Sequence, residues 1–80
     1  MRSEAEWAAE AKRILRAEMV RRGVTYDELA KKLAKIGVEQ SPSSLRMTIN
    51  RGRFRAMLLL QCLTAMRCGS LRITDPEENG

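Results

Sequence analysis

The sequence predicts an all-α protein, a compact domain of four helices. Apolar residues recur at intervals of three and four through most of the chain, which is the period of an amphipathic helix. Gly23, Gly37 and Gly52 interrupt this pattern and divide it into helix-sized stretches. A chain of 80 residues forms one domain with a thin core.

The first helix is expected at about residues 4–22. Ser3 and Glu6 have the spacing of a capping box, in which a hydroxyl and a carboxylate satisfy each other's backbone amides. We expect Trp7 to be a core residue at the start of the apolar stripe. That stripe consists of Trp7, Ala11, Ile14, Leu15 and Met19.

The second helix is expected at about residues 26–36, after a second capping box made by Thr25 and Glu28. Gly37 is suited to cap its C-terminal end, and Val38 is expected to be buried and to anchor the turn. The predicted buried face is Leu29, Ala30, Leu33 and Ile36.

The third helix is expected at about residues 42–51, with Ser41 as N-cap and Pro42 at the first helical position. Leu45 and Ile49 lie one turn apart and are expected to face inward.

The fourth helix is expected at about residues 55–67, with Phe54 in the core just before it. Its apolar content predicts burial on most sides. The residues concerned are Met57, Leu58, Leu59, Leu60, Leu63 and Met66.

The C-terminal part divides at residue 73. Leu71-Arg72-Ile73 alternates in polarity and is expected to form an extra strand or an extended arm. Residues 1–73 are therefore the predicted domain, and residues 74–80 a flexible acidic tail.

Composition argues against several functional classes. The chain has no histidine, no glycine-rich phosphate loop and no nucleophile beside a base, so we expect no enzyme, no cofactor and no metal site. Cys62 and Cys68 are expected to be free thiols in a cytoplasmic protein. The charged N-terminus is unlike a signal peptide, and no apolar stretch is long enough to span a membrane.

Positive charge gathers in the second half of the chain. The net charge is +5, and residues 39–73 hold six arginines against one acid, Glu39. Clustered arginine is typical of a surface that contacts phosphates.

Two short capped helices joined by a glycine-containing turn are the elements of a helix-turn-helix. Because Leu45 and Ile49 face inward, the free side of the third helix can enter a major groove, where arginine pairs with guanine and asparagine with adenine. The predicted base contacts are Ser43, Arg46, Met47 and Asn50. The predicted phosphate contacts are Ser44, Arg51, Arg53 and Arg55.

Residues 12–68 resemble the Cro/repressor-like helix-turn-helix family. The matching segments are Thr25-Tyr26-Asp27-Glu28-Leu29-Ala30, Gly37-Val38, Asn50-Arg51-Gly52 and Leu58 to Met66. The resemblance implies a DNA-binding fold with the third helix in the major groove. The segment between Leu29-Ala30 and Gly37-Val38 is longer than that family's by about one helical turn of 3.6 residues, and Val38 to Leu45 is also longer. The turn is therefore expanded, which leaves the angle between the second and third helices open.

The chain also resembles a small bacterial domain family of unassigned function. The residues that carry this resemblance are Trp7, Ala11-Lys12, Leu15, Arg22-Gly23-Val24-Thr25-Tyr26, Leu29-Ala30, Ile36-Gly37-Val38, Arg51-Gly52 and Leu59-Leu60-Gln61-Cys62-Leu63.

The sequence therefore predicts a sequence-specific DNA-binding transcriptional regulator of bacterial or phage type. A homodimer is expected, because one short helix reads too few bases for operator-level specificity. Its interface would be the fourth helix or the segment Leu71-Arg72-Ile73. The alternative is a small protein-interaction module that uses the same scaffold and its positive face to bind an acidic partner protein.

Overall fold

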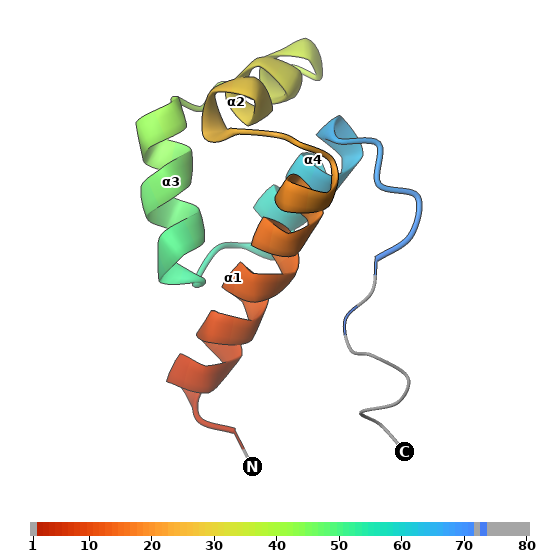
Figure 1. The fold of residues 1–80 in the computed structure, drawn as a ribbon. Coiled ribbons are helices and arrows are strands. Elements are labelled where there is room, and N and C mark those ends of the chain that lie inside the picture. The colour runs from red at the N-terminus through yellow and green to blue at the C-terminus, as the bar shows by residue number, and fades with distance from the viewer. Residues whose placement is uncertain (1, 72, 74–80) are drawn as a thin grey trace.

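The computed structural model describes residues 2–71 and 73, and in them the chain forms four α-helices and no strand (Figure 1). The all-α prediction is confirmed, and each predicted helix boundary lies within two residues of the observed one. The helices are α1 (Glu4–Arg21), α2 (Tyr26–Lys35), α3 (Pro42–Arg51) and α4 (Ala56–Ala65).

Local hydrogen bonds explain where the helices begin. The Glu6 N–H donates to Ser3 Oγ at 3.2 Å, and the Ser3 N–H donates to Glu6 Oε1 at 3.0 Å. Thr25 and Glu28 make the same reciprocal pair at the start of α2, at 3.1 and 3.2 Å. Both predicted capping boxes are thus confirmed.

Gly52 ends α3 and also allows α3 to approach α1. Its φ of 68° lies in the left-handed region, where a residue without Cβ is favoured. A Cβ at this position would stand 1.9 Å from the carbonyl oxygen of Ala8. The end of α3 therefore presses its backbone against the first half of α1.

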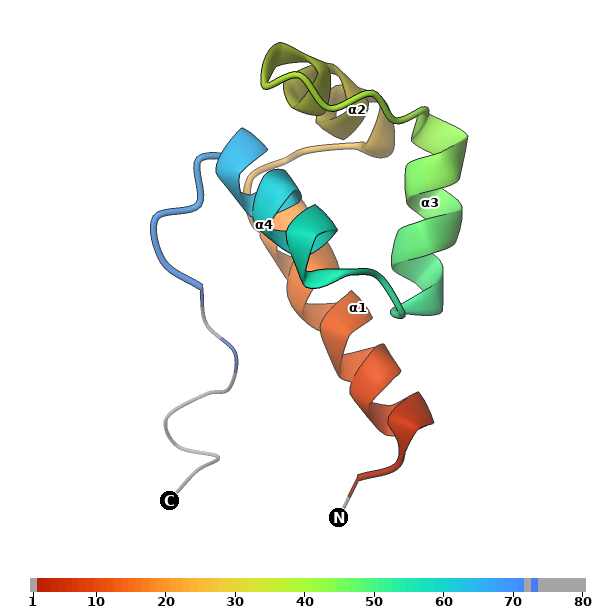
Figure 2. The ribbon, with the colours of Figure 1, turned by 180° about the vertical axis from the view of Figure 1, so that it is seen from behind.

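The helices enclose one small core. In Figure 1, α3 lies beside α1, α2 lies above them, and α4 lies behind α1; Figure 2 shows α4 from the other side. Every helix contributes to the core, whose buried residues are Leu15, Met19, Leu29, Leu33, Leu45, Ile49, Cys62, Leu63 and Met66. Val38 and Phe54 are half-buried and pack against it, as expected.

Glu18 fastens the segment after α4 to α1. Its side chain is buried, with the Arg21 guanidinium at 2.5 Å and that of Arg22 at 3.3 Å. The Cys68 thiol donates to the same carboxylate with an Sγ–O distance of 3.7 Å. A buried carboxylate needs such partners, because burial removes its hydration.

The prediction that Trp7 is a core residue is wrong. Its side chain is 58% exposed, and the guanidinium of Arg2 lies over its ring at 5.0 Å from the centroid. The first turns of α1 project beyond the other helices, so no helix covers this part of the apolar stripe (Figure 1).

Two further burial predictions are wrong. Ile36 is exposed because it is the C-cap of α2, where the chain turns away from the core. Met57 and Leu60 are exposed because α4 lies at the surface and only one of its faces meets the core. The burial of α4 on most sides is therefore not observed.

The C-terminal segment forms no strand at Leu71 or Ile73. Leu71 is half-buried against the core, and the Ile73 carbonyl accepts a hydrogen bond from Arg13 at 2.8 Å. Arg72 and the predicted acidic tail, residues 74–80, lie outside the described residues.

Candidate nucleic-acid interface

All four side chains predicted to contact bases are exposed on α3, with Arg46 at the edge that faces α1 and the start of α2. Leu45 and Ile49 are completely buried and hold the helix against the core. The opposite stripe is exposed along its length, with Met47 56% exposed near its middle. The exposed predicted residues are Ser43, Arg46, Met47 and Asn50.

A cluster of two arginines and a tyrosine joins α3 to α1 and α2. The Tyr26 ring lies between α1 and α3, with the Arg16 guanidinium 5.3 Å and that of Arg46 5.4 Å from its centroid. Arg16 Nη1 also donates to the Tyr26 hydroxyl at 2.8 Å. We call Arg16, Tyr26 and Arg46 the arginine–tyrosine cluster.

The arginine–tyrosine cluster borders a surface hollow between α1, the start of α2 and α3. The hollow is lined by Arg16, Met19, Val20, Val24, Thr25, Tyr26, Asp27 and Arg46. Within the described part of the chain, no ion pair joins Arg16 or Arg46 to a carboxylate. Both guanidiniums therefore keep donors that an external anion can use.

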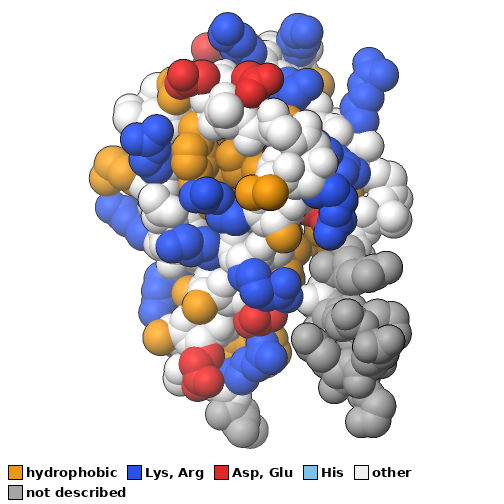
Figure 3. Space-filling view, viewed as in Figure 1, with side chains coloured by type: hydrophobic (Ala, Val, Ile, Leu, Met, Phe, Trp, Pro, Cys, Tyr) orange, Lys and Arg blue, Asp and Glu red, His pale blue; other side chains and the backbone are white. Residues whose placement is uncertain are grey.

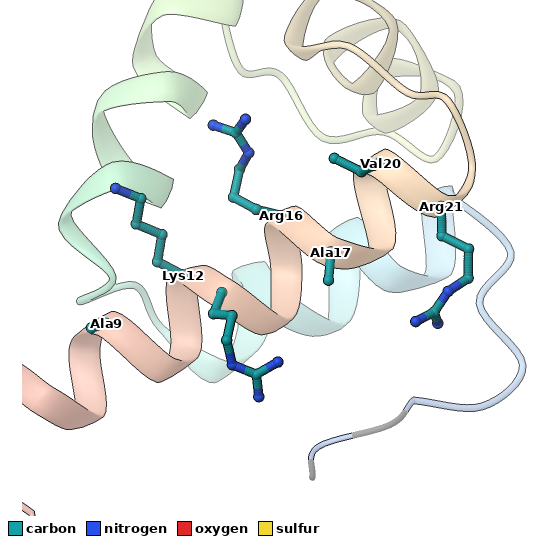
Figure 4. Close-up of a pocket in the computed structure, with 7 residues that line it drawn as sticks. Ala9, Lys12, Arg16, Ala17, Val20 and Arg21 are labelled. Carbon is teal, nitrogen blue, oxygen red and sulfur yellow. The ribbon is translucent and has the colours of Figure 1, made fainter. Parts of the chain in front are cut away.

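A shallow groove along the outer side of α1 continues this basic surface (Figure 4). Its residues are Ala9, Lys12, Arg13, Arg16, Ala17, Val20 and Arg21. Lys12 and Arg16 extend toward α3, whereas Arg21 points to the other side, where it pairs with Glu18 (Figure 4).

The sequence alone does not single out Lys12, Arg16 or Tyr26 as site residues. A signal was present, because Lys12 and Arg16 are four residues apart and so share a helix face. That Arg16 meets Tyr26 and Arg46 depends on how α1, α2 and α3 pack.

The four residues predicted to contact phosphates are exposed but do not form one group. The Ser44 hydroxyl donates to Gln40 Oε1 at 3.2 Å, in a hollow that α3 shares with α4. Arg53 Nη1 lies 3.4 Å from Glu4 Oε2 and is drawn toward the start of α1. Arg51 is the last residue of α3 and Arg55 the N-cap of α4, and neither has an ion pair among the described residues.

The face that carries α1 and α3 is mainly basic. Figure 3 shows Lys and Arg side chains spread across it, with apolar patches between them and fewer acidic side chains. Such a surface attracts a polyanion, and small apolar patches within it allow contact with flat or methylated groups.

The described residues include no group of three or more potential metal ligands among His, Cys, Asp and Glu. Cys62 is a buried free thiol whose pKa is raised to about 11 by that burial. It therefore stays protonated at neutral pH and packs as a small apolar residue. No described helix has the length and apolar character needed to cross a membrane.

Residues 7–71 match the model of a family described as a domain of unknown function, DUF6471. This match agrees with the second resemblance seen in the sequence, to a small domain family of unassigned function. No curated protein and no solved structure matches the chain. The resemblance to Cro/repressor-like domains stays a prediction.

Proposed function

We propose that this chain, which belongs to the DUF6471 family of domains of unknown function, binds double-stranded DNA as a sequence-specific transcriptional regulator of bacterial or phage type. The observation that carries the proposal is the exposed polar stripe of α3. This helix is fixed by Leu45 and Ile49 and presents its polar stripe outward, beside arginines that have no carboxylate partner among the described residues.

In the proposed complex α3 lies in the major groove. Asn50 can make paired hydrogen bonds to adenine, Met47 can meet a thymine methyl, and Ser43 can donate to or accept from a base edge. Arg51 and Arg55 follow at the end of the helix, where the backbone strand passes.

The helix-turn-helix in this proposal consists of α2 and α3. Figure 1 shows α2 above the start of α3 and not parallel to it, which supports this interpretation. The link between them is residues 36–41, longer than the usual turn of about three or four residues. The N-cap at Ser41 and the packing of Leu45 fix the start of α3 despite the longer link.

A regulator of this kind needs no catalytic residues, cofactor or metal, and it acts in the cytoplasm, where its DNA is.

We further propose that it binds as a homodimer, since α4 exposes Met57 and Leu60 on the side away from the core. Two copies joined there would place two α3 helices on adjacent half-sites.

The test is selection of bound duplexes from a randomised pool, followed by sequencing. Wild-type protein is expected to enrich a motif, and Asn50→Ala to lose preference at particular base pairs while keeping its fold. Lys35→Ala is the matched control, because Lys35 is exposed at the C-terminal end of α2 and lines neither of the two hollows that border α3. Absence of binding at about 50 mM salt, where non-specific binding is strong, would contradict the proposal.

A second candidate function is binding of an acidic partner protein, and the groove on α1 favours it. Val20 is 72% exposed in this groove and lies with Ala9 and Ala17 among basic side chains. An acidic amphipathic helix would match this combination of small apolar floor and positive rim. Val20→Asp would abolish such binding and leave the base preferences of α3 unchanged, which distinguishes the two functions.

A further inference from the structure

We propose that Arg16 and Arg46 hold one backbone phosphate of the DNA between them at the arginine–tyrosine cluster, so that Arg46 contacts a phosphate instead of a base. The inference rests on the proposed function, and it moves one side chain of α3 from base reading to phosphate binding. It also makes α1 part of the DNA interface.

The first support is the position of the two charges. Both guanidiniums lie against the same ring, at 5.3 and 5.4 Å from its centroid, although like charges repel. The attraction of each cation to the ring partly offsets this repulsion. No described carboxylate pairs with either arginine, so an anion arriving at the hollow meets two unpaired positive charges.

The second support is the supply of hydrogen-bond donors. Arg16 Nη1 donates to the Tyr26 oxygen at 2.8 Å, which leaves the hydroxyl hydrogen of Tyr26 free to point into the hollow. Guanidinium nitrogens from α1 and α3 add further donors. A phosphodiester has two charged oxygens that accept several such bonds, and arginine is well suited to bind them.

The third support is the shape of the complex. A helix with its side chains is about 10–12 Å wide, and the major groove is about 12 Å wide. A helix in that groove therefore has a phosphate strand along each side. The arginine–tyrosine cluster lies on the side of α3 that faces α1 and the start of α2, where one strand would pass.

Asp27 is the acidic residue among those that line the same hollow. It makes no ion pair with Arg16 or Arg46 among the described contacts, so both guanidiniums keep hydrogen-bond donors for an anion. Its negative charge would repel the phosphate. Asp27→Asn is therefore expected to tighten DNA binding.

The experiment measures binding of the full chain to its selected duplex and to a scrambled duplex, over about 50–200 mM salt. Arg16→Gln and Arg46→Gln are each expected to weaken binding about tenfold, equally for both duplexes. Log affinity falls as log salt rises, and the double variant should make this slope shallower by about 0.9, the value for one phosphate. Lys35→Gln is the control, and circular dichroism verifies that each variant is folded.

Tyr26→Phe separates the hydroxyl from the ring. The variant keeps the ring against which both guanidiniums lie and removes only the hydroxyl. We therefore expect a smaller loss of DNA affinity than for either arginine variant.

Three results would overturn the inference. If Arg46→Gln changes the preferred base at one position, Arg46 reads a base. If both arginine variants bind DNA as tightly as wild type, and Asn50→Ala alone loses base preference, no phosphate is held at the cluster and the proposed function stands. If wild type binds no duplex at all, the inference and the proposed function both fail.

Discussion

Gly23 and Gly52 have nearly the same backbone conformation, with φ of 65° and 68°, but very different surroundings. A Cβ added at Gly23 would meet nothing within 4 Å, whereas one at Gly52 would collide with the backbone of Ala8. The two positions therefore separate the intrinsic strain of a left-handed residue from the effect of close packing between α3 and α1.

We expect Gly52→Ala to destabilise the protein far more than Gly23→Ala. The conformational strain alone costs about 1–2 kcal/mol at either position. At Gly52 the displaced helix raises the total to about 3 kcal/mol or more. Urea unfolding of both variants measures the difference, and equal losses in the free energy of unfolding would show that α3 does not press on α1.

Single residues also show where sequence reasoning stops. The place of Arg46 on α3 predicts a base contact, which stays a prediction, and the structure adds that its guanidinium lies over Tyr26. Trp7 was assigned to the core from its spacing, and it lies where α1 extends beyond its neighbours. The surroundings of both side chains depend on how helices distant in sequence pack against α1 and α3.

The helices themselves could be predicted closely, because their ends are set by local chemistry. Capping boxes at Ser3 and Thr25, the serine-proline start of α3 and the glycines at three helix ends all act within a few residues. The exposed outer face of α4 could not be predicted, since its apolar composition is also that of a buried helix.

The capping boxes predict how stability depends on pH. The backbone N–H of Ser3 lowers the pKa of Glu6, and that of Thr25 lowers the pKa of Glu28. A carboxylate whose pKa is lowered by folding stabilises the protein above its unfolded-state pKa, and the contribution is lost as the pH falls through the folded-state pKa. The free energy of unfolding should therefore fall as the pH drops below about 4.3, where unfolded glutamates titrate.

Glu28→Gln tests this assignment. Glutamine keeps the geometry of a capping box but does not titrate, so the variant should show a shallower loss of stability at acid pH than wild type. Thermal unfolding between about pH 6 and 3 gives the comparison. Identical pH profiles for the two proteins would mean that Glu28 does not contribute to the acid sensitivity.

The exposed outer face of α4 is the surface at which we expect two copies of the chain to associate. Leu60 is 62% exposed, and Met57 lies near it on the same helix, so a second copy of the chain could cover both. Leu60→Lys would then convert a dimer to a monomer, whereas Ala34→Lys, at an exposed site on α2, would not. Sedimentation equilibrium distinguishes these results, and a monomeric wild type at high micromolar concentration would rule out the dimer.

At the scale of the whole molecule, α1 and α3 together form one mainly basic face (Figure 3). The basic side is built from α1 and α3, and the exposed leucine and methionine of α4 lie on a helix behind α1 (Figures 1 and 3). If the proposed DNA complex and the proposed dimer both form, they would use different helices, α3 and α4, and so would not compete. The sequence predicted an arginine-rich second half, but Lys12 and Arg16 from the first half complete the basic side.

The most direct test of the central claim is an NMR titration of the full chain with its selected duplex, following each backbone amide. If α3 contacts DNA, shifts will concentrate at residues 43–51 and around Tyr26 and Arg16, and the amides of α4 will change little. Shifts confined to α4 or to the far side of α1, with residues 43–51 unchanged, would show that α3 does not contact DNA.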